Sequence, residues 1–286
     1  MVVWKGKEVS DRIKIRIEEG MKKLNGYIPT LAIVRVGEKP DDISYERGAR
    51  KKAESMELLV RSFAFPETIT EEQFLDEFQS INEDERIDGI LLLKPLPRHI
   101  SEKKIEQILN PLKDLDGITP ANIAGVFAGE TSAFAPCTAQ AVMEVLDFYG
   151  EAVEGKRAVV IGRSMVVGRP LAMLLLRKNA TVTICHTKTK DLEKVCKEAD
   201  ILVAAAGKAK MADDRFVREG AVVLDVGIHV DEDGKLCGDV DFESASSRAS
   251  AITPVPGGVG TVTTAVLCLH LVQAALRKGD EKWETF

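Results

Sequence analysis

Residues 157–170 read RAVVIGRSMVVGRP, and this stretch decides the fold of the second half of the chain. The aliphatic run that ends at Ile161 predicts a buried strand, and an apolar helical pattern begins after Gly168. Glycines between a strand and a helix allow a tight turn and close backbone approach, while the N-terminus of the helix favours an anion. The stretch therefore predicts a phosphate-binding turn. Its G-x5-G spacing differs from the usual dinucleotide fingerprint, so an ordinary strand–helix turn is the alternative.

Strand and helix patterns alternate on both sides of this stretch. After it, strands are predicted in TVTIC, ILVAAAG and AVVLDVG, and helices at residues 191–198 and from about 263 to 278. Before it, strands are predicted at residues 30–36, 59–65 and 89–93, and helices at 10–24, 42–56 and 70–82. Such alternation is typical of α/β folds, in which helices cover a largely parallel sheet.

Three polar residues are expected to cap helices. Ser10 is a predicted N-cap, and Thr70 with Gln73 three residues later forms a predicted capping box. Thr138 is the predicted N-cap of an apolar helix that stops at Gly150. The alternation of strand and helix patterns restarts around this helix, which indicates a domain junction just before it.

Length and this junction together predict two domains. With 286 residues, 45% of them hydrophobic and 29% charged, the chain is long enough for two full cores. We expect domains at residues 1–135 and 136–286, each an α/β unit with a largely parallel sheet and flanking helices. The second is expected to be Rossmann-like, and its final helix to pack back on the first domain.

Composition argues against several classes of protein. A net charge of -6 gives no basic surface for nucleic acid. No apolar run approaches the roughly 20 residues of a membrane-spanning helix, and the opening residues MVVWKGKEVS lack a secretory signal, so we expect a cytoplasmic protein without a membrane partner. The 5 cysteines are scattered without C-x-x-C spacing, so neither a disulfide framework nor a metal site is indicated, and mostly buried, reduced thiols are expected.

The end of the second strand in the Rossmann-like domain bears on the cofactor. NAD-binding folds usually place an acidic residue there, but TVTIC is followed by His186, Thr187 and Lys188. An acid would repel a 2'-phosphate, whereas Arg163, Thr187 and Lys188 can bind one. The pattern therefore favours NADP over NAD. The alternative is that the lysines here belong only to a solvated surface.

Further motifs occur in the order and spacing of a known family. Along the chain they are VG (36–37), P (40) before Y (45), DGIL (88–91), PLP (95–97), KD (113–114), DG (116–117), PCT (136–138), GRS (162–164), VGRP (167–170), DVGI (225–228) and TPVPGGVG (253–260). With these motifs the chain resembles the methylenetetrahydrofolate dehydrogenase/cyclohydrolase family over nearly its whole length.

The resemblance implies a homodimeric enzyme that oxidises 5,10-methylenetetrahydrofolate to the 5,10-methenyl form with NADP. It implies that folate lies in the cleft between a folate-binding first domain and the nucleotide-binding second domain, with Tyr45 and Asp116 as catalytic residues. The implied substrate-binding residues are Tyr45, Leu93, Asp116, Pro256, Gly257, Gly258, Val259 and Gly260. The expected cofactor-binding residues are Gly162, Arg163, Ser164, Val167, Gly168, Thr187, Lys188, Gly227 and Ile228.

Two positions depart from the family's pattern. Bifunctional members carry a lysine four residues after the tyrosine, where it serves hydrolysis of the methenyl product, and a glutamine in the apolar strand that helps to set this lysine's protonation state. Here these positions are Ala49 and Leu93. Hydride transfer needs the folate to be oriented against the nicotinamide, whereas hydrolysis of the methenyl product must activate water and move protons. We therefore expect the dehydrogenase to persist and the cyclohydrolase to be weak or lost.

Nearby lysines are candidates to replace the missing one. Lys51 lies about 200° round the helix from Ala49, whereas Lys52 lies only about 60° away and is the possible substitute. Lys94 follows Leu93 on a strand and is expected to project to the opposite face. A solvated surface position is the alternative for all three lysines.

Other functions stay open at this point. One is a fully bifunctional dehydrogenase/cyclohydrolase that uses a substitute lysine. Another is a non-catalytic protein that binds folate and nucleotide, because two expected catalytic residues are replaced. The last is a different two-domain α/β dehydrogenase.

Overall fold

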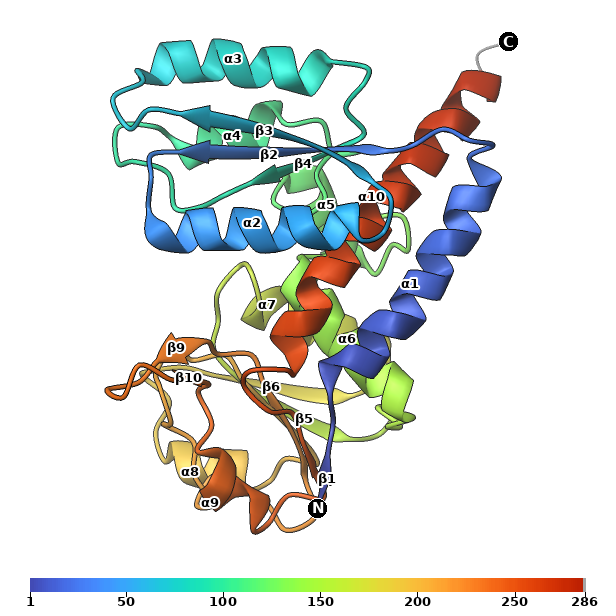
Figure 1. The fold of residues 1–286 in the computed structure, drawn as a ribbon. Coiled ribbons are helices and arrows are strands. Elements are labelled where there is room, and N and C mark those ends of the chain that lie inside the picture. The colour runs from blue at the N-terminus through green and yellow to red at the C-terminus, as the bar shows by residue number, and fades with distance from the viewer. Residues whose placement is uncertain (285–286) are drawn as a thin grey trace. The chain divides into compact units, whose positions relative to one another are not determined.

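The chain folds into two compact units in the computed structural model, which describes residues 1–284, with side chains described to residue 278 (Figure 1). The three-stranded unit consists of residues 12–125, 131–135 and those from 264 onward. The six-stranded unit consists of residues 1–11, 126–130 and 136–263. Residues 285 and 286 of the expected second domain lie outside the described residues.

The three-stranded unit is an α/β layer structure. Its parallel sheet has the order β3-β2-β4, with β2 at Thr30–Val36, β3 at Leu59–Phe65 and β4 at Gly89–Leu92. Figure 1 shows α2 (Pro40–Glu54) and α3 (Glu71–Glu83) on opposite faces of this sheet. Phe74 and Phe78 of α3 are fully buried against β2 and β4 residues, and each contributes about 1.5–3 kcal/mol by burial. The remaining helices of this part of the chain are α1 (Gly6–Lys23), α4 (Glu102–Ile108), α5 (Pro120–Ala128) and α10 (Val259–Glu284).

The six-stranded unit is Rossmann-like. Its parallel sheet has the order β1-β11-β8-β7-β5-β6, so the strand order reverses at β5, which has β6 on one side and β7 on the other. The strands are β1 (Val2–Val3), β5 (Arg157–Ile161), β6 (Thr181–Cys185), β7 (Ile201–Ala204), β8 (Val222–Asp225) and β11 (Ala251–Ile252), and a hairpin adds β9 (His229–Val230) and β10 (Leu236–Cys237). The helices are α6 (Cys137–Tyr149), α7 (Gly168–Arg177), α8 (Leu192–Cys196) and α9 (Phe242–Ser246).

The first residues of the chain correct the expected domain boundary. Residues 1–11 were assigned by the sequence to the first domain, but β1 pairs with β11, and Val2 matches Ala251 in register. They therefore belong to the six-stranded unit. A strand of two residues is too short to show a period in the sequence, and its pairing is decided by a partner far along the chain.

The predicted helix caps had mixed outcomes. The capping box is confirmed, because Gln73 N donates to Thr70 Oγ1 and Thr70 N donates to Gln73 Oε1. Ser10 is not an N-cap, since α1 begins at Gly6 and the Ser10 hydroxyl donates to Thr261 O at 3.3 Å. The prediction of Thr138 as an N-cap is also wrong, because α6 begins at Cys137 and Pro136 is its N-cap residue.

The last helix corrects the expectation that no segment is apolar enough to span a membrane. Val259–Lys278 has a mean hydropathy of 1.7 and meets that criterion by length and composition. However, 72% of its most apolar window is buried inside the protein, as in the core helix of a folded domain. The apolar composition of α10 is therefore explained by packing within the chain.

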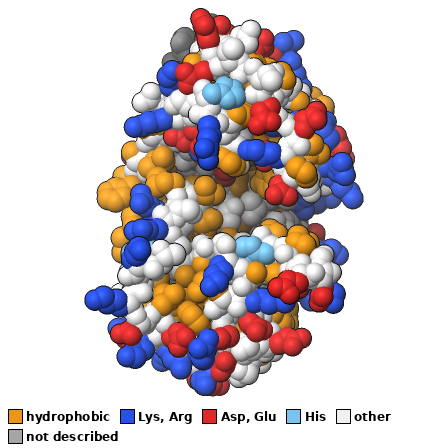
Figure 2. Space-filling view, turned by 90° about the vertical axis from the view of Figure 1, so that its left-hand side faces the viewer, with side chains coloured by type: hydrophobic (Ala, Val, Ile, Leu, Met, Phe, Trp, Pro, Cys, Tyr) orange, Lys and Arg blue, Asp and Glu red, His pale blue; other side chains and the backbone are white. Residues whose placement is uncertain are grey.

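The surface carries charges of both signs. Figure 2 shows Lys and Arg side chains interspersed with Asp and Glu side chains on the face that it displays. This distribution is consistent with 39 basic and 45 acidic residues in the sequence. The 5 cysteines are free and buried, as expected.

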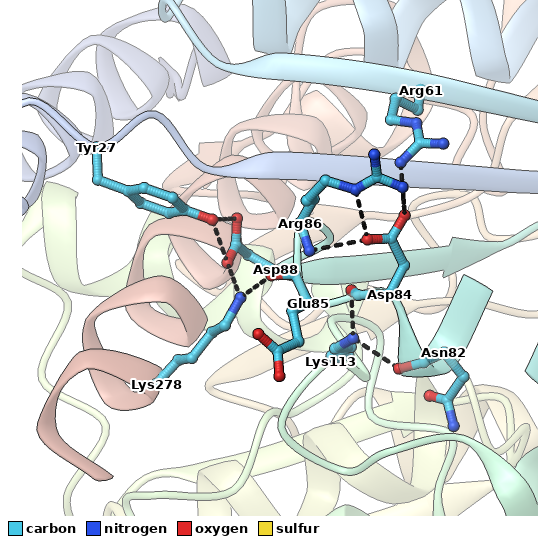
Figure 3. A network of polar contacts seen from close by, with 9 residues as sticks. All are labelled: Tyr27, Arg61, Asn82, Asp84, Glu85, Arg86, Asp88, Lys113 and Lys278. Carbon is cyan, nitrogen blue, oxygen red and sulfur yellow. Dashed lines mark hydrogen bonds and ion pairs between the residues drawn. The ribbon is translucent and has the colours of Figure 1, made fainter. Parts of the chain in front are cut away.

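An ion pair between a buried carboxylate and Lys278 ties α10 to the sheet of the three-stranded unit (Figure 3). Asp88 precedes β4, and its side chain is wholly buried. It accepts hydrogen bonds from the Tyr27 hydroxyl at 2.8 Å and from Thr30 N at 2.9 Å, and it pairs with Lys278 Nζ at 3.0 Å. Burial, together with the hydrogen bond and charge of Asp88, raises the pKa of Tyr27 to about 12, so this hydroxyl stays a donor.

We predict that Asp88→Ala destabilises the protein by about 2–4 kcal/mol, because it leaves the partly buried Lys278 ammonium without its carboxylate partner and the N–H of Thr30 without an acceptor. Urea unfolding of the variant measures this change. The control is Lys14→Ala, which removes an exposed pair with Glu18 at 3.8 Å and should change stability by less than about 0.5 kcal/mol. Equal stability of the two variants would show that the Asp88 network contributes nothing beyond a surface pair.

Candidate functional site

The carboxyl end of the sheet in the three-stranded unit positions Tyr45. Its helix α2 begins directly after β2, and Arg35 Nε pairs with Glu46 Oε2 at 2.7 Å, which fixes the first turns of α2 to that strand. Lys39 Nζ donates to Pro95 O at 2.7 Å and so holds the start of α2 next to the segment after β4. Tyr45 is 39% exposed.

Leu93 and Asp116 lie at the same end of this sheet. Leu93 directly follows β4, its N–H donates to Val34 O at 2.9 Å, and its side chain is buried. Asp114 forms a parallel bridge with Ile90, so the chain runs alongside β4 and carries Asp116 toward the end of that strand. Asp116 is half-buried. Parallel sheets bind ligands at their carboxyl ends, which makes this group a candidate folate site.

The turn around Asp116 is held by its buried neighbour Asp114. The carboxylate of Asp114 accepts from Ile118 N, from Thr119 N and its hydroxyl, and from Asn122 Nδ2 at 2.9 Å. A carboxylate with this many donors fixes the backbone on which Asp116 stands. The segment is anchored to α10 as well, because His270 Nδ1 hydrogen-bonds Leu115 O at 2.8 Å.

The candidate replacement lysines lie in different surroundings. Ala49 is fully buried on α2. Burial raises the pKa of the Cys268 thiol on α10 to about 12, and the charge of Lys52 on α2 acts in the opposite direction. Lys94 pairs with Glu106 at 2.8 Å and Glu102 at 3.3 Å. Burial alone lowers the pKa of Lys94, but these carboxylates outweigh it and raise the pKa, which keeps the ammonium charged.

The glycine turn of the six-stranded unit joins β5 to α7. Gly162 has φ +130°, and a Cβ there would lie 2.1 Å from Ala205 O, while a Cβ on Gly168 would lie 2.1 Å from Gly162 O. Only glycine fits at both positions. The Ser164 hydroxyl accepts from Val167 N at 3.1 Å, which shapes the loop and still leaves the hydroxyl proton to donate.

A second turn follows β6 beside the glycine turn. Gly162 N donates to Cys185 O at 2.9 Å, so the two strand ends are directly connected. His186 N donates to Thr189 Oγ1, and Lys188 N to His186 Nδ1, which leaves Thr187 and Lys188 exposed on this turn. The glycine turn, the helix N-terminus and these two residues fit a dinucleotide phosphate group.

The proline–glycine segment adjoins the predicted cofactor edge within the six-stranded unit. A Cβ on Gly260 would lie 3.1 Å from Ile228 Cδ1, and Ile228 itself is 61% exposed. Pro256 and Gly257 are exposed, whereas Gly258 and Val259 are buried. The side chain of Val259 therefore packs inside, and any contact of Gly258 with a ligand is limited to its backbone.

The sequence assigns no function to the side chains of two carboxylates that are buried at this edge. Asp225 ends β8 and accepts from the N–H groups of Gly227, Asp239 and Val240 at 2.9–3.0 Å. Burial raises the pKa of Asp225 to about 6, although these N–H groups act to lower it. Asp239 is wholly buried and accepts from His229 Nε2 at 2.7 Å. Asp225 begins the motif DVGI, whereas Asp239 belongs to none of the motifs, and its hydrogen-bond donors lie in other loops.

The predicted site residues thus form two groups. Tyr45, Leu93, Asp116 and Lys52 belong to the three-stranded unit. Within the six-stranded unit lie Gly162, Arg163, Ser164, Val167, Gly168, Thr187, Lys188, Gly227, Ile228 and the segment 256–260. The residues of the second group occupy loops and the first residues of α7 and α10 at the carboxyl edge of its sheet.

Comparison with known proteins agrees with this division. Residues 4–116 match the profile of the tetrahydrofolate dehydrogenase/cyclohydrolase catalytic domain, and residues 136–279 match the NAD(P)-binding domain of the same family. The chain belongs to the tetrahydrofolate dehydrogenase/cyclohydrolase family. It is an α/β enzyme of that family, with an NAD(P)-binding domain as the sequence predicted.

Individual relatives extend the similarity over almost the whole chain. The bifunctional protein FolD of Clostridium kluyveri is 49% identical over 97% of this chain and 98% of its own length. FolD of Carboxydothermus hydrogenoformans is 51% identical over 94% and 95%, respectively. These relatives of the tetrahydrofolate dehydrogenase/cyclohydrolase family are both described as bifunctional.

Solved structures of the family have the same fold. The FolD methylenetetrahydrofolate dehydrogenase/cyclohydrolase of Campylobacter jejuni has a TM-score of 0.94 and 40% identity, covering 97% of this chain and 99% of that one. The dehydrogenase-cyclohydrolase of Trypanosoma brucei, solved with NADP and an inhibitor, has a TM-score of 0.89 and 34% identity, covering 97% and 98%.

Proposed function

We propose that this protein oxidises 5,10-methylenetetrahydrofolate to 5,10-methenyltetrahydrofolate with NADP, and that hydrolysis of the methenyl product is weak or lost. The observation that carries the dehydrogenase is the close approach of the Gly260 backbone to Ile228, where a Cβ on Gly260 would lie 3.1 Å from Ile228 Cδ1. It joins the segment expected to bind folate to the loop expected to bind the nicotinamide. Membership of the family supports the same reaction.

Hydride transfer depends on how the folate and the nicotinamide are oriented more than on proton transfer. When bound, the nicotinamide supplies the hydride acceptor. Tyr45 and Asp116 orient the folate, Asp116 as a carboxylate that accepts N–H groups of the pterin. The glycine turn and the N-terminus of α7 hold the cofactor phosphates. Loss of hydride from the one-carbon unit gives the methenyl cation directly, so no general base is required.

NADP is preferred to NAD because of the charges beside β6. Among the described residues, Arg163 and Lys188 have no carboxylate partner, and the sequence from 185 to 190 contains no acid. Both residues follow neighbouring parallel strands, since Ile161 matches Cys185 in register. A 2'-phosphate placed between them would gain charge-assisted hydrogen bonds that NAD cannot make.

Hydrolysis is proposed to be weak because its proton-transfer groups are replaced. Ala49 and Leu93 are both buried and have no titratable atom. Lys94 is held by two carboxylates and stays charged, which makes it a poor base. The similarity to bifunctional FolD proteins favours the alternative that hydrolysis persists, and Lys52 is then the proposed substitute.

A homodimer is proposed from the resemblance and from an open sheet edge. Strand β3 is at the edge of its sheet, and Leu59 and Phe65 direct their backbone groups toward the β2 side. The backbone groups of Val60, Ser62 and Ala64 therefore point outward, with the Val60 carbonyl accepting from Arg50 at 3.5 Å. An open edge strand is a template for pairing with a second copy.

Arg163→Ala and Lys188→Ala should each lower kcat/KM for NADP by about 10- to 100-fold, because a charge-assisted hydrogen bond contributes about 1.5–3 kcal/mol. The value for NAD should stay within about twofold in steady-state assays. Lys178→Ala, which removes an exposed pair with Asp147 at 3.6 Å, is the control and should leave both cofactors unaffected. An equal loss with NADP and NAD would exclude recognition of the 2'-phosphate.

For the wild-type protein with methylenetetrahydrofolate and NADP, reduced cofactor and methenyl product should appear together and the methenyl form should accumulate. The double variant Ala49→Lys with Leu93→Gln should raise methenyl hydrolysis by up to about 100- to 10,000-fold, because it restores a group for proton transfer. Ala49→Met with Leu93→Gln is the matched control without that charge. Wild-type hydrolysis well above the buffer rate, abolished by Lys52→Met, would establish the bifunctional alternative instead.

Ser62→Pro should weaken self-association at least tenfold in sedimentation equilibrium, because proline removes an outward N–H from β3. Ser62→Ala loses the same side-chain hydrogen bond with Arg50 but keeps the N–H, and it should associate like the wild type. A wild-type protein that stays monomeric at micromolar concentration would refute the homodimer.

A further inference from the structure

Asp239 fixes the loop that follows β7. Its Oδ2 accepts from Ala206 N at 2.6 Å and Gly207 N at 3.0 Å, and its Oδ1 accepts from Lys208 N at 2.8 Å. The side chain is wholly buried. Three consecutive N–H groups bound to one carboxylate hold a short loop in a single conformation, and a carboxylate buried in this way depends on those donors.

The same carboxylate reaches the loop that follows β8. His229 Nε2 lies 2.7 Å from Asp239 Oδ1, and the imidazole is 22% exposed while the carboxylate is not exposed at all. The backbone of Gly227 passes so close that a Cβ there would lie 2.4 Å from Asp239 Cγ. Asp239 therefore sets the position of the residues on both sides of Ile228.

Asp225 holds Asp239 in place. The Asp225 carboxylate accepts from the backbone N–H groups of Asp239 and Val240, each at 2.9 Å. Gly238 is needed for this approach, because a Cβ there would lie 1.9 Å from Asp225 Oδ2. The two acids thus connect the end of β8 to the loop after β7 through hydrogen bonds.

These loops lie on one side of the glycine turn. In the sheet, β6 neighbours β5 on one side, and β7 with β8 follow on the other. The loop after β7 contacts the turn directly, since Ala205 N donates to Ile161 O at 2.8 Å. A dinucleotide lies across such a reversal of strand order. With the 2'-phosphate beside β6, the nicotinamide is on the side of β7 and β8.

We propose that Asp239 is a positioning residue for the nicotinamide end of the cofactor, linking the loop 205–208 to the loop 226–229. The inference rests on the proposed NADP-dependent function. Asp239 touches neither the cofactor nor the folate in this role. It acts through His229 and the three N–H groups, and so sets the distance at which Ile228 presents the nicotinamide to the segment around Gly260.

The test compares the whole cofactor with a fragment that lacks the nicotinamide. For Asp239→Asn, titration calorimetry with NADP and with adenosine 2',5'-bisphosphate is combined with steady-state kinetics. We expect kcat to fall by about 10- to 100-fold and NADP affinity to fall about tenfold, because a misplaced reactant loses rate steeply. Affinity for the fragment should stay within about twofold. Circular dichroism establishes that the variant is folded.

Asp200→Asn is the matched control. Asp200 also accepts a backbone N–H of the sheet, from Arg157 at 2.9 Å, but it lies at the opposite, amino edge. This variant should leave kcat and both affinities unchanged. If NADP and the fragment lose affinity equally in Asp239→Asn, the residue only supports the fold and the inference fails. It also fails if kcat and NADP affinity are unchanged.

If Asp239→Asn does not fold, His229→Ala tests the inference instead. This variant removes the hydrogen bond between Asp239 and the loop 226–229 at a partly exposed residue. A fall in kcat of about threefold or more, with unchanged fragment binding, supports the inference. An unchanged kcat with unchanged NADP affinity overturns it. A wild-type enzyme without turnover would refute the proposed function separately, and the ratio of NADP to fragment affinity would still test Asp239.

Discussion

The hydrogen bonds that two buried carboxylates make to backbone N–H groups are the constraint on which the cofactor edge depends. Taking an ionised carboxylate out of water is costly unless donors replace the lost hydration. Asp225 and Asp239 meet this requirement only when three loops adopt one arrangement together. The same requirement that permits burial of the acids therefore fixes the loops that surround the end of the sheet.

The three-stranded unit uses the same principle at another place. Asp114 accepts hydrogen bonds from the turn that carries Asp116. Asp88 accepts a hydrogen bond from the start of β2 and pairs with Lys278 of α10. In each case a buried acid ties together segments that are distant in the chain. The backbone that carries Asp116 is held in this way by its neighbour Asp114.

The two reactions of the family differ in the titratable side chains that they need. Hydride transfer depends on the position of two ligands, which a rigid framework provides without a titratable side chain. Hydrolysis needs a group that can change protonation at the substrate. The chain keeps the framework and replaces Lys and Gln of the family pattern by Ala49 and Leu93, while the charged Lys94 is paired with Glu102 and Glu106.

The sequence by itself determined the α/β class, most strands, the glycine turn and the family, because these depend on local periodicity and on short motifs. The capping box at Thr70 is of this local kind. Only the tertiary structure decided that residues 1–11 join the six-stranded unit and that Asp239 serves two loops. A two-residue strand has no period, and an isolated aspartate carries no local signal. Their roles depend on N–H groups that folding brings from elsewhere in the chain.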